Sequence, residues 1–246
     1  MRRSLLACSF VLLTPRVFAA TTEFGVDCNA VVSDCQAAFD GAVQDISSAL
    51  NYKQLGPAEA TGITGIGVGV IANYTTTENK DAWQTLTGTD VDAVGMAGIV
   101  ATKGLPFGID VGAFYTAIPD TSVKAYGAEL RYAILEGGVA QPALAVRGAY
   151  TRTAGIDDFD YEAWNADVSL SKGFAVLTPY IGAGYIWATA TPTGSAEQDF
   201  GLSEVDAEKE RFFAGLRLSL GFLELTPEYE RSGDNNAYNL RVGLSF

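Results

Sequence analysis

Few side chains in this sequence could support catalysis. Histidine is absent from all 246 residues, so the usual proton carrier at neutral pH is missing. Ser169 and Lys172 match the S-x-x-K spacing of serine acylases, but that motif begins a helix, whereas this segment alternates like a strand. We therefore predict that the protein is not an enzyme and that it has no catalytic residues, no cofactor and no metal site.

Two cysteines that lie close together in the sequence, Cys28 and Cys35, could react with each other. In an oxidising compartment this arrangement favours a small disulfide loop, and two free thiols are the alternative. Two cysteines without any histidine do not complete a usual structural zinc site. The third cysteine, Cys8, falls within an N-terminal segment that we expect to be removed.

Charged side chains recur at the polar positions of alternating segments, where a period of two places them on one face of a strand. If such strands close into a barrel, these side chains face the lumen. The set comprises Asp110, Glu129, Arg131, Arg147, Asp167, Arg217, Glu224, Glu228, Glu230 and Arg241. Counted from the last hairpin, Glu228 can lie opposite Arg241. Two interpretations stay open: paired charges that fill a narrow barrel, or a thin pathway that slightly favours cations.

The N-terminus has the pattern of a secretory signal peptide. Arg2 and Arg3 precede a short apolar run at 5–13, and small residues follow as far as Ala19. We predict that residues 1–19 are removed and that the rest is exported. No later run reaches the roughly 18 apolar residues that a membrane helix requires. A membrane protein with this sequence would therefore be a barrel.

Composition limits the possible partners. The net charge is −13, which argues against nucleic-acid binding, because that function needs a basic face. Aromatic residues make up 11% of the chain and charged residues only 18%, and there are 27 glycines. These values suit β structure with a large apolar surface.

The segment at the C-terminus alternates strictly between apolar and polar residues and finishes on an aromatic ring. Its apolar positions are Tyr238, Leu240, Val242, Leu244 and Phe246. This pattern resembles the closing strand of Gram-negative outer-membrane β-barrels, whose assembly machinery reads a C-terminal Phe preceded by alternating apolar residues. The resemblance implies location in the cell outer membrane. It also implies contact with outer-membrane lipid and lipopolysaccharide, and the barrel assembly machinery as a partner.

The alternation extends back to about residue 61 and predicts a closed antiparallel transmembrane β-barrel of about ten strands, all-β in class. The predicted strands are 62–75, 93–102, 107–116, 123–134, 142–152, 162–172, 179–189, 211–220, 223–231 and the terminal segment. Tight links alternate with longer ones, notably 76–92 and 190–210, which we expect to be outer loops. In architecture, 61–246 resembles small opacity-protein-like and OmpA-like barrels.

Residues 20–60 form a separate N-terminal segment. Phe39, Val43, Ile46 and Leu50 recur at helical spacing and predict an α-helix over about 34–50. Glycines on the inner faces of several predicted strands leave room for something slim. We therefore expect the helix to be either periplasmic or a plug in the lumen.

The sequence favours an integral outer-membrane barrel with a structural or surface-interaction role. The alternative function is a narrow or plugged channel for small or hydrophobic solutes. The competing fold is a soluble lipocalin-like barrel, which would bury its apolar face inside and turn its charges outward. The sequence does not determine the oligomeric state.

Overall fold

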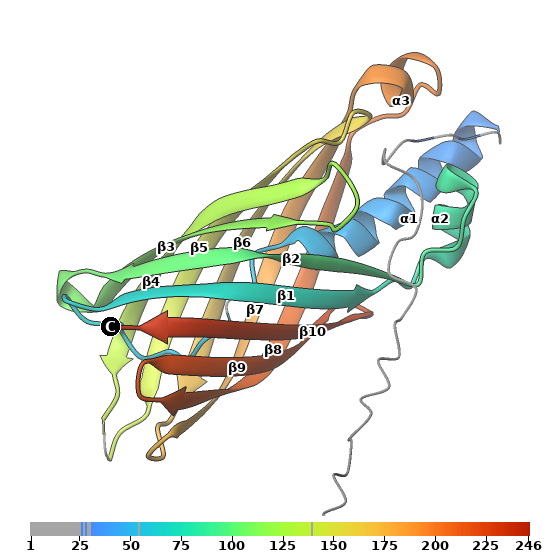
Figure 1. Cartoon of the computed structure of the whole chain (residues 1–246). Coiled ribbons are helices and arrows are strands. Elements are labelled where there is room, and N and C mark those ends of the chain that lie inside the picture. The colour runs from blue at the N-terminus through green and yellow to red at the C-terminus, as the bar shows by residue number, and fades with distance from the viewer. Residues whose placement is uncertain (1–25, 27, 29–30, 54, 139) are drawn as a thin grey trace, which may run out of the picture.

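The computed structural model describes residues 26, 28, 31–53, 55–138 and 140–246, and the predicted signal peptide lies outside these residues. The described residues form ten antiparallel strands that close into a barrel, with β1 pairing to both β2 and β10 (Figure 1). The strands are β1 (Ile66–Thr76), β2 (Ala93–Gly104), β3 (Ile109–Ala117), β4 (Lys124–Glu136), β5 (Ala143–Ala154), β6 (Phe159–Ser171), β7 (Leu177–Pro192), β8 (Val205–Leu220), β9 (Leu223–Ser232) and β10 (Asn235–Ser245). The predicted fold class is confirmed.

Three α-helices and one short 3-10 turn accompany these strands in the described part of the chain. They are α1 (Val32–Leu50), α2 (Lys80–Thr87), η1 (Pro106–Gly108) and α3 (Gly194–Gln198). None of these helices is long and apolar enough to span a membrane.

The two ends of the barrel differ in their connections. Consecutive strands are joined by short links at one end, for example Gly221-Phe222 between β8 and β9, where Gly221 has φ 67°. Longer links, which contain α2 and α3, lie at the other end (Figure 1). Outer-membrane barrels keep short turns in the periplasm and long loops outside. The end with α2 and α3 is therefore the outer end, and the C-terminal Phe246 lies at the periplasmic end, stacked on Phe222.

Over most of its height the barrel has an apolar outer face and a charged inner face. Val68, Leu130 and Ile181 are exposed on the outside, whereas Glu129 and Asp167 are buried inside. This arrangement is the reverse of a soluble lipocalin-like barrel, so that alternative is wrong for this part of the molecule. We call it the membrane zone; it includes 164–171 of β6 and 211–220 of β8.

Near the outer end the polarity of the two faces is inverted. In β6, Asp160 and Glu162 face outward and are exposed, while Phe159 and Tyr161 face inward and are buried. The first residues of β8 repeat this pattern, with acidic residues outward and small apolar residues inward. We call this the outer zone; it comprises 159–163 of β6, 186–192 of β7 and 205–210 of β8.

The outer zone corrects one prediction. The sequence indicated a long loop over 190–210, but β7 continues to Pro192 and β8 already begins at Val205. Asp206, Glu208 and Glu210 therefore lie on a strand. The pattern was misleading because these strands leave the lipid, so that water, and no longer hydrocarbon, meets their outer face.

Candidate functional site: the filled lumen

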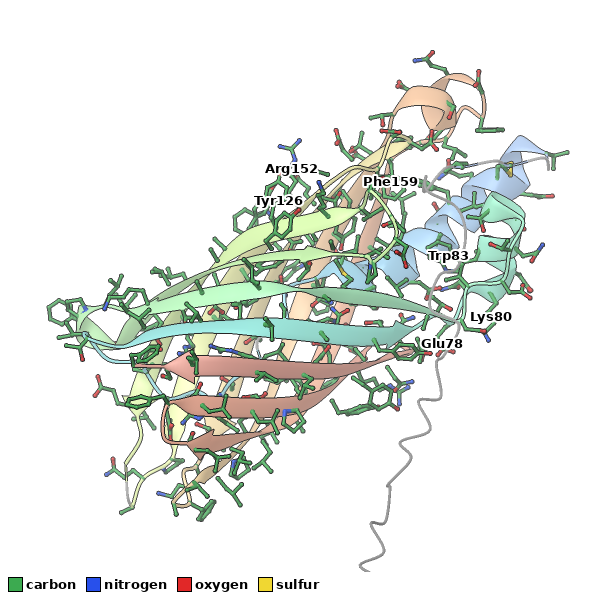
Figure 2. The ribbon with its side chains drawn as sticks, viewed as in Figure 1. Glu78, Lys80, Trp83, Tyr126, Arg152 and Phe159 are labelled. Carbon is green, nitrogen blue, oxygen red and sulfur yellow. A yellow bond between two sulfur atoms is a disulfide. The ribbon has the colours of Figure 1, made fainter. Side chains whose placement is uncertain are left out.

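Helix α1 supplies the core of the outer zone. Its predicted apolar stripe is buried, and Phe39 packs edge-to-face on Phe159 of β6 with ring centroids 5.6 Å apart. The same apolar cluster contains Val43 and Ile46 from α1 and inward residues of β6, β7 and β8. Figures 1 and 2 show α1 at the outer end, beside α2 and on the same side as Trp83 and Phe159. The helix therefore enters the outer mouth of the barrel and is not periplasmic.

A buried carboxylate on α1 fixes the helix to the loop after β1. Asp45 accepts hydrogen bonds from the backbone N–H of Asn79 at 3.0 Å, from Trp83 Nε1 at 2.9 Å and from Asn235 Nδ2 at 2.7 Å. It also accepts the backbone N–H of Glu78 at 3.1 Å. Charge-assisted bonds of this kind are stronger than neutral ones. They hold the helix, α2 and the start of β10 together.

The surface of the outer end is exposed and charged. Lys80 on α2 contacts Asp92 at 2.5 Å, and that hydrogen bond raises the pKa of the Lys80 ammonium (Figure 2). A disulfide joins Cys28 and Cys35 at the start of α1.

After α1 the chain runs through the barrel towards the periplasmic end. We call residues 51–60 the threaded segment; all but residue 54 are described. Its start touches strands near the outer zone, since Asn165 Nδ2 and Arg211 each donate to the Tyr52 carbonyl at 3.1 Å. Further along, the Ala58 N–H donates to Ser171 Oγ at 3.1 Å. The lumen thus contains backbone from the chain itself.

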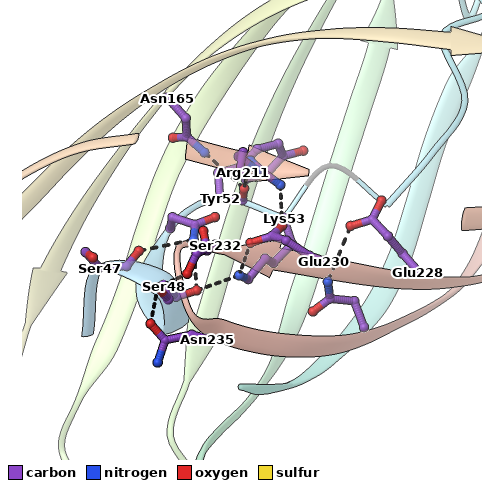
Figure 3. A network of polar contacts seen from close by, with 12 residues as sticks. Ser47, Ser48, Tyr52, Lys53, Asn165, Arg211, Glu228, Glu230, Ser232 and Asn235 are labelled. Carbon is purple, nitrogen blue, oxygen red and sulfur yellow. Dashed lines mark hydrogen bonds and ion pairs between the residues drawn. The ribbon is translucent and has the colours of Figure 1, made fainter. Parts of the chain in front are cut away.

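A lysine of the threaded segment is buried against the barrel wall. Lys53 Nζ lies 2.8 Å from a Glu230 carboxylate oxygen and donates to the Ser48 carbonyl at 2.6 Å (Figure 3). Both side chains of the Lys53–Glu230 pair are at most 2% exposed. Arg211 also contacts Glu230, on its second carboxylate oxygen.

The Lys53–Glu230 pair belongs to a larger network, which we call the charge belt: Lys53, Glu129, Arg147, Asp167, Arg211 and Glu230. Arg147 contacts Asp167 and lies 3.5 Å from Glu129, and Arg211 lies 3.7 Å from Asp167. The Arg147 guanidinium also lies 5.1 Å from the centre of the Tyr52 ring, a cation–π geometry. Three cations and three carboxylates therefore neutralise one another around the threaded segment.

Below the belt, further pairs hold the end of the threaded segment. Arg131 Nη2 lies 2.6 Å from Asp110, and its Nη1 donates to the Pro57 carbonyl at 2.8 Å. Arg217 Nη2 lies 2.5 Å from Glu59, and its Nε lies 3.8 Å from Glu224. The strands thus contact the threaded segment through hydrogen bonds and ion pairs along most of its length.

All the charged residues singled out from the sequence face the lumen, but one expected pairing is wrong. Glu228 lies opposite Asn239, and Arg241 lies opposite Thr226. The reason is the length of the hairpin: β9 continues to Ser232 and β10 resumes at Asn235, so the turn is shorter than expected. Glu228 instead accepts hydrogen bonds from Tyr180 Oη at 2.8 Å and Asn239 Nδ2 at 3.3 Å.

Several residues of the network were missed from the sequence. Arg211 has the same strand parity as Arg217, which was a usable signal. Tyr52 and Lys53 precede a Gly-Pro turn and have no periodic pattern that could have identified them. Asp45 lies on the helix among apolar residues, and nothing in the sequence indicates its partners.

The alternating residues of the terminal segment lie on the outer face of β10. Tyr238, Leu240, Val242 and Leu244 are exposed there, and Phe246 is exposed at the end of the chain. Their part in recognition by the assembly machinery stays a prediction. Among the described residues, no group of three or more His, Cys, Asp or Glu side chains could hold a metal ion.

A closed barrel with an apolar band outside and paired charges inside is an outer-membrane β-barrel. The chain belongs to the family of unknown function DUF6588, whose family model matches residues 20–246. A search of curated proteins found no match.

Solved structures with a similar fold include outer-membrane proteins. The KdgM porin in complex with disordered oligogalacturonate is 5% identical, with a TM-score of 0.40, and the match covers 73% of this chain and 99% of the porin. The attachment invasion locus protein Ail of Yersinia pestis is 14% identical, with a TM-score of 0.35 and coverage of 74% and 97%. The N-terminal barrel domain of Pseudomonas aeruginosa OprF is 12% identical, with a TM-score of 0.33 and coverage of 75% and 99%. Likenesses this distant say nothing about function.

Proposed function

We propose that the protein is a closed outer-membrane barrel with a structural or surface-interaction role and no catalytic activity. The observation that carries this proposal is the threaded segment, which occupies the lumen and is enclosed by the charge belt. Tyr52 and Leu55 are each 1% exposed, and Ala58 is fully buried. A lumen filled by its own chain favours a barrel that conducts no solute in its resting state.

The outer end is the part available to other molecules. It presents α2, α3, the disulfide-linked start of α1 and the acidic outer faces of β6 and β8. Lipopolysaccharide is the partner that we expect around the rim of the barrel, and the assembly machinery is the partner that we expect to read β10 during insertion.

One feature favours a second candidate, a plugged channel for small or hydrophobic solutes. The threaded segment is held largely by polar contacts to the wall, such as Lys53 to Glu230 and Arg217 to Glu59. If the segment withdraws, water can hydrate these polar groups in place of the lost contacts. The barrel would then open without any change in its strands.

Planar-bilayer conductance separates the two candidates. The full mature chain is compared with a variant that lacks residues 21–56, after heat-modifiable migration has shown that each barrel is folded. The proposal expects no conductance steps from the full chain, even at raised voltage, and steps from the shortened chain, which has lost most of the segment that fills the lumen. Steps from the full chain would favour the plugged channel, and silence from a folded shortened barrel would mean that the threaded segment is not what closes the lumen.

Because α1 forms the core of the outer zone, the deletion could prevent folding. A second variant avoids this difficulty. Tyr52→Gly with Lys53→Gly removes the bulk of the threaded segment at the charge belt and keeps α1 in place. The proposal expects conductance steps from this variant and none from the full chain, and silence from both would mean that these two side chains do not close the lumen.

A further inference from the structure

A polar cavity of about 250 Å³ lies inside the barrel near the periplasmic end. The end of the threaded segment forms one side, and the first residues of β1 and the last of β10 form another. Its lining includes Pro57, Thr61, Gly67, Thr102, Thr226 and Arg241. The cavity lies on the periplasmic side of the charge belt, and Glu129 of the belt forms part of its lining.

Three arginines line this cavity, and one of them has no acidic partner. Arg131 is paired with Asp110, and Arg217 is paired with Glu59. Arg241 lies opposite Thr226, and no hydrogen bond or ion pair joins it to any of the described residues. It is only 9% exposed, and its Nε is buried without a hydrogen-bond acceptor. A buried guanidinium in this state is energetically costly unless a counterion reaches it.

Glycines clear the space that Arg241 occupies. A Cβ placed on Gly69 would lie 3.0 Å from Arg241 Nε, and one on Gly67 would lie 3.1 Å from Nη2. A Cβ on Gly243 would lie 3.2 Å from Nε. The guanidinium therefore lies against bare backbone of β1 and β10. This close packing against the backbone holds the Arg241 side chain beside the cavity.

The nearby carboxylates are already engaged. Glu59 and Glu224 contact Arg217, and Glu129 contacts Arg147. The counterion of Arg241 must therefore come from solution or be taken from Arg217. A cavity of 250 Å³ has room for an ion of the size of phosphate or acetate together with water, which occupies about 30 Å³ per molecule in the liquid.

We propose that this cavity binds one small oxyanion, a carboxylate or phosphate group, on the guanidinium of Arg241. A guanidinium presents parallel N–H donors that match the two oxygens of such a group. The hydroxyl groups of Thr102, Thr226 and Ser245 also line the cavity and can donate to a bound oxyanion. The ligand enters from the periplasm and compensates the arginine charge.

Isothermal titration of the full mature chain, refolded in a non-ionic detergent, tests this site with inorganic phosphate and with acetate as probes. We expect saturable binding of at least one probe and at least tenfold weaker binding to Arg241→Gln. Arg231→Gln is the matched control, because Arg231 is an exposed arginine on the neighbouring strand β9 that pairs with Asp234. It should bind as the unchanged protein does.

Three outcomes would overturn the proposal. Equal binding to the Arg241→Gln variant would place the anion elsewhere. No binding to the unchanged protein, combined with binding to Glu224→Gln, would mean that Glu224 turns from Arg217 to Arg241 and acts as an internal counterion. Absence of binding in all variants, with folded barrels shown by heat-modifiable migration, would also reject the site. A water-soluble short-chain phosphatidylglycerol, titrated in the same way, distinguishes a lipid phosphate from a free one.

Discussion

The outer zone and the membrane zone are built from the same strands, yet their faces have opposite polarity. In β8, Leu216 faces outward and Arg217 inward within the membrane zone. Toward the start of the same strand, Asp206 faces outward and Ala207 inward. Alternation alone therefore identifies a strand, but the medium outside determines which of its faces is apolar.

The contents of the barrel change with this inversion. In the membrane zone the interior contains the charge belt, to which the threaded segment contributes Lys53, and the apolar residues face lipid. In the outer zone the interior holds the apolar stripe of α1, and the charges meet water. The apolar side of α1 thus forms a hydrophobic core inside the outer zone, as the interior of a soluble protein does.

The largest effect is expected in the charge belt. Glu230→Ala leaves Lys53 and Arg211 buried without their shared carboxylate, and removal of one partner from a buried ion pair costs about 3–5 kcal/mol. Urea unfolding of the refolded barrel, followed by tryptophan fluorescence, measures this loss. Asp234→Ala, in the turn of the same hairpin, removes an exposed carboxylate and should change the free energy of unfolding by less than about 0.5 kcal/mol. Equal losses of unfolding free energy in the two variants would show that water reaches the ion pairs of the charge belt.

A loss of similar size is expected from the core of the outer zone. Phe39→Ala removes a ring that is 1% exposed, and such truncations cost about 3–5 kcal/mol. Limited proteolysis should then cut the outer loops before the strands of the membrane zone, because the helix has lost its ring contact with Phe159 of β6. Val31→Ala, at an exposed position just before α1, should leave the cleavage pattern unchanged. If Phe39→Ala behaved as this control does, α1 would not be the core of the outer zone.

A smaller change in stability distinguishes the outward face of the membrane zone from that of the outer zone. Ile181→Arg places a charge on the face that we assign to lipid, where a cation costs about 2–4 kcal/mol near the bilayer centre. Thr191→Arg places the same charge on the same strand in the outer zone, beside Glu204, and should cost less than about 0.5 kcal/mol. Folding into lipid vesicles at increasing urea concentration compares the two variants. Similar costs would mean that the zones do not differ in their surroundings.

The sequence predicted what depends on local pattern. The strands, their number and the inward position of Glu129 and Arg147 follow from a period of two. The filling of the lumen could not be predicted in the same way. Lys53 meets Glu230 only because the barrel closes around a segment that has no periodicity of its own. The acidic residues of early β8 indicated a loop, because their role depends on where the strand leaves the lipid.

Spin labels placed along β6 and β8 test the inversion of polarity most directly. Labels are attached in turn at Val168 and Leu216 in the membrane zone and at Asp160 and Asp206 in the outer zone, with the barrel reconstituted in lipid vesicles. We expect Val168 and Leu216 to be accessible to dissolved oxygen and protected from a water-soluble nickel complex, and Asp160 and Asp206 to show the opposite. The same accessibility at all four positions would contradict the account.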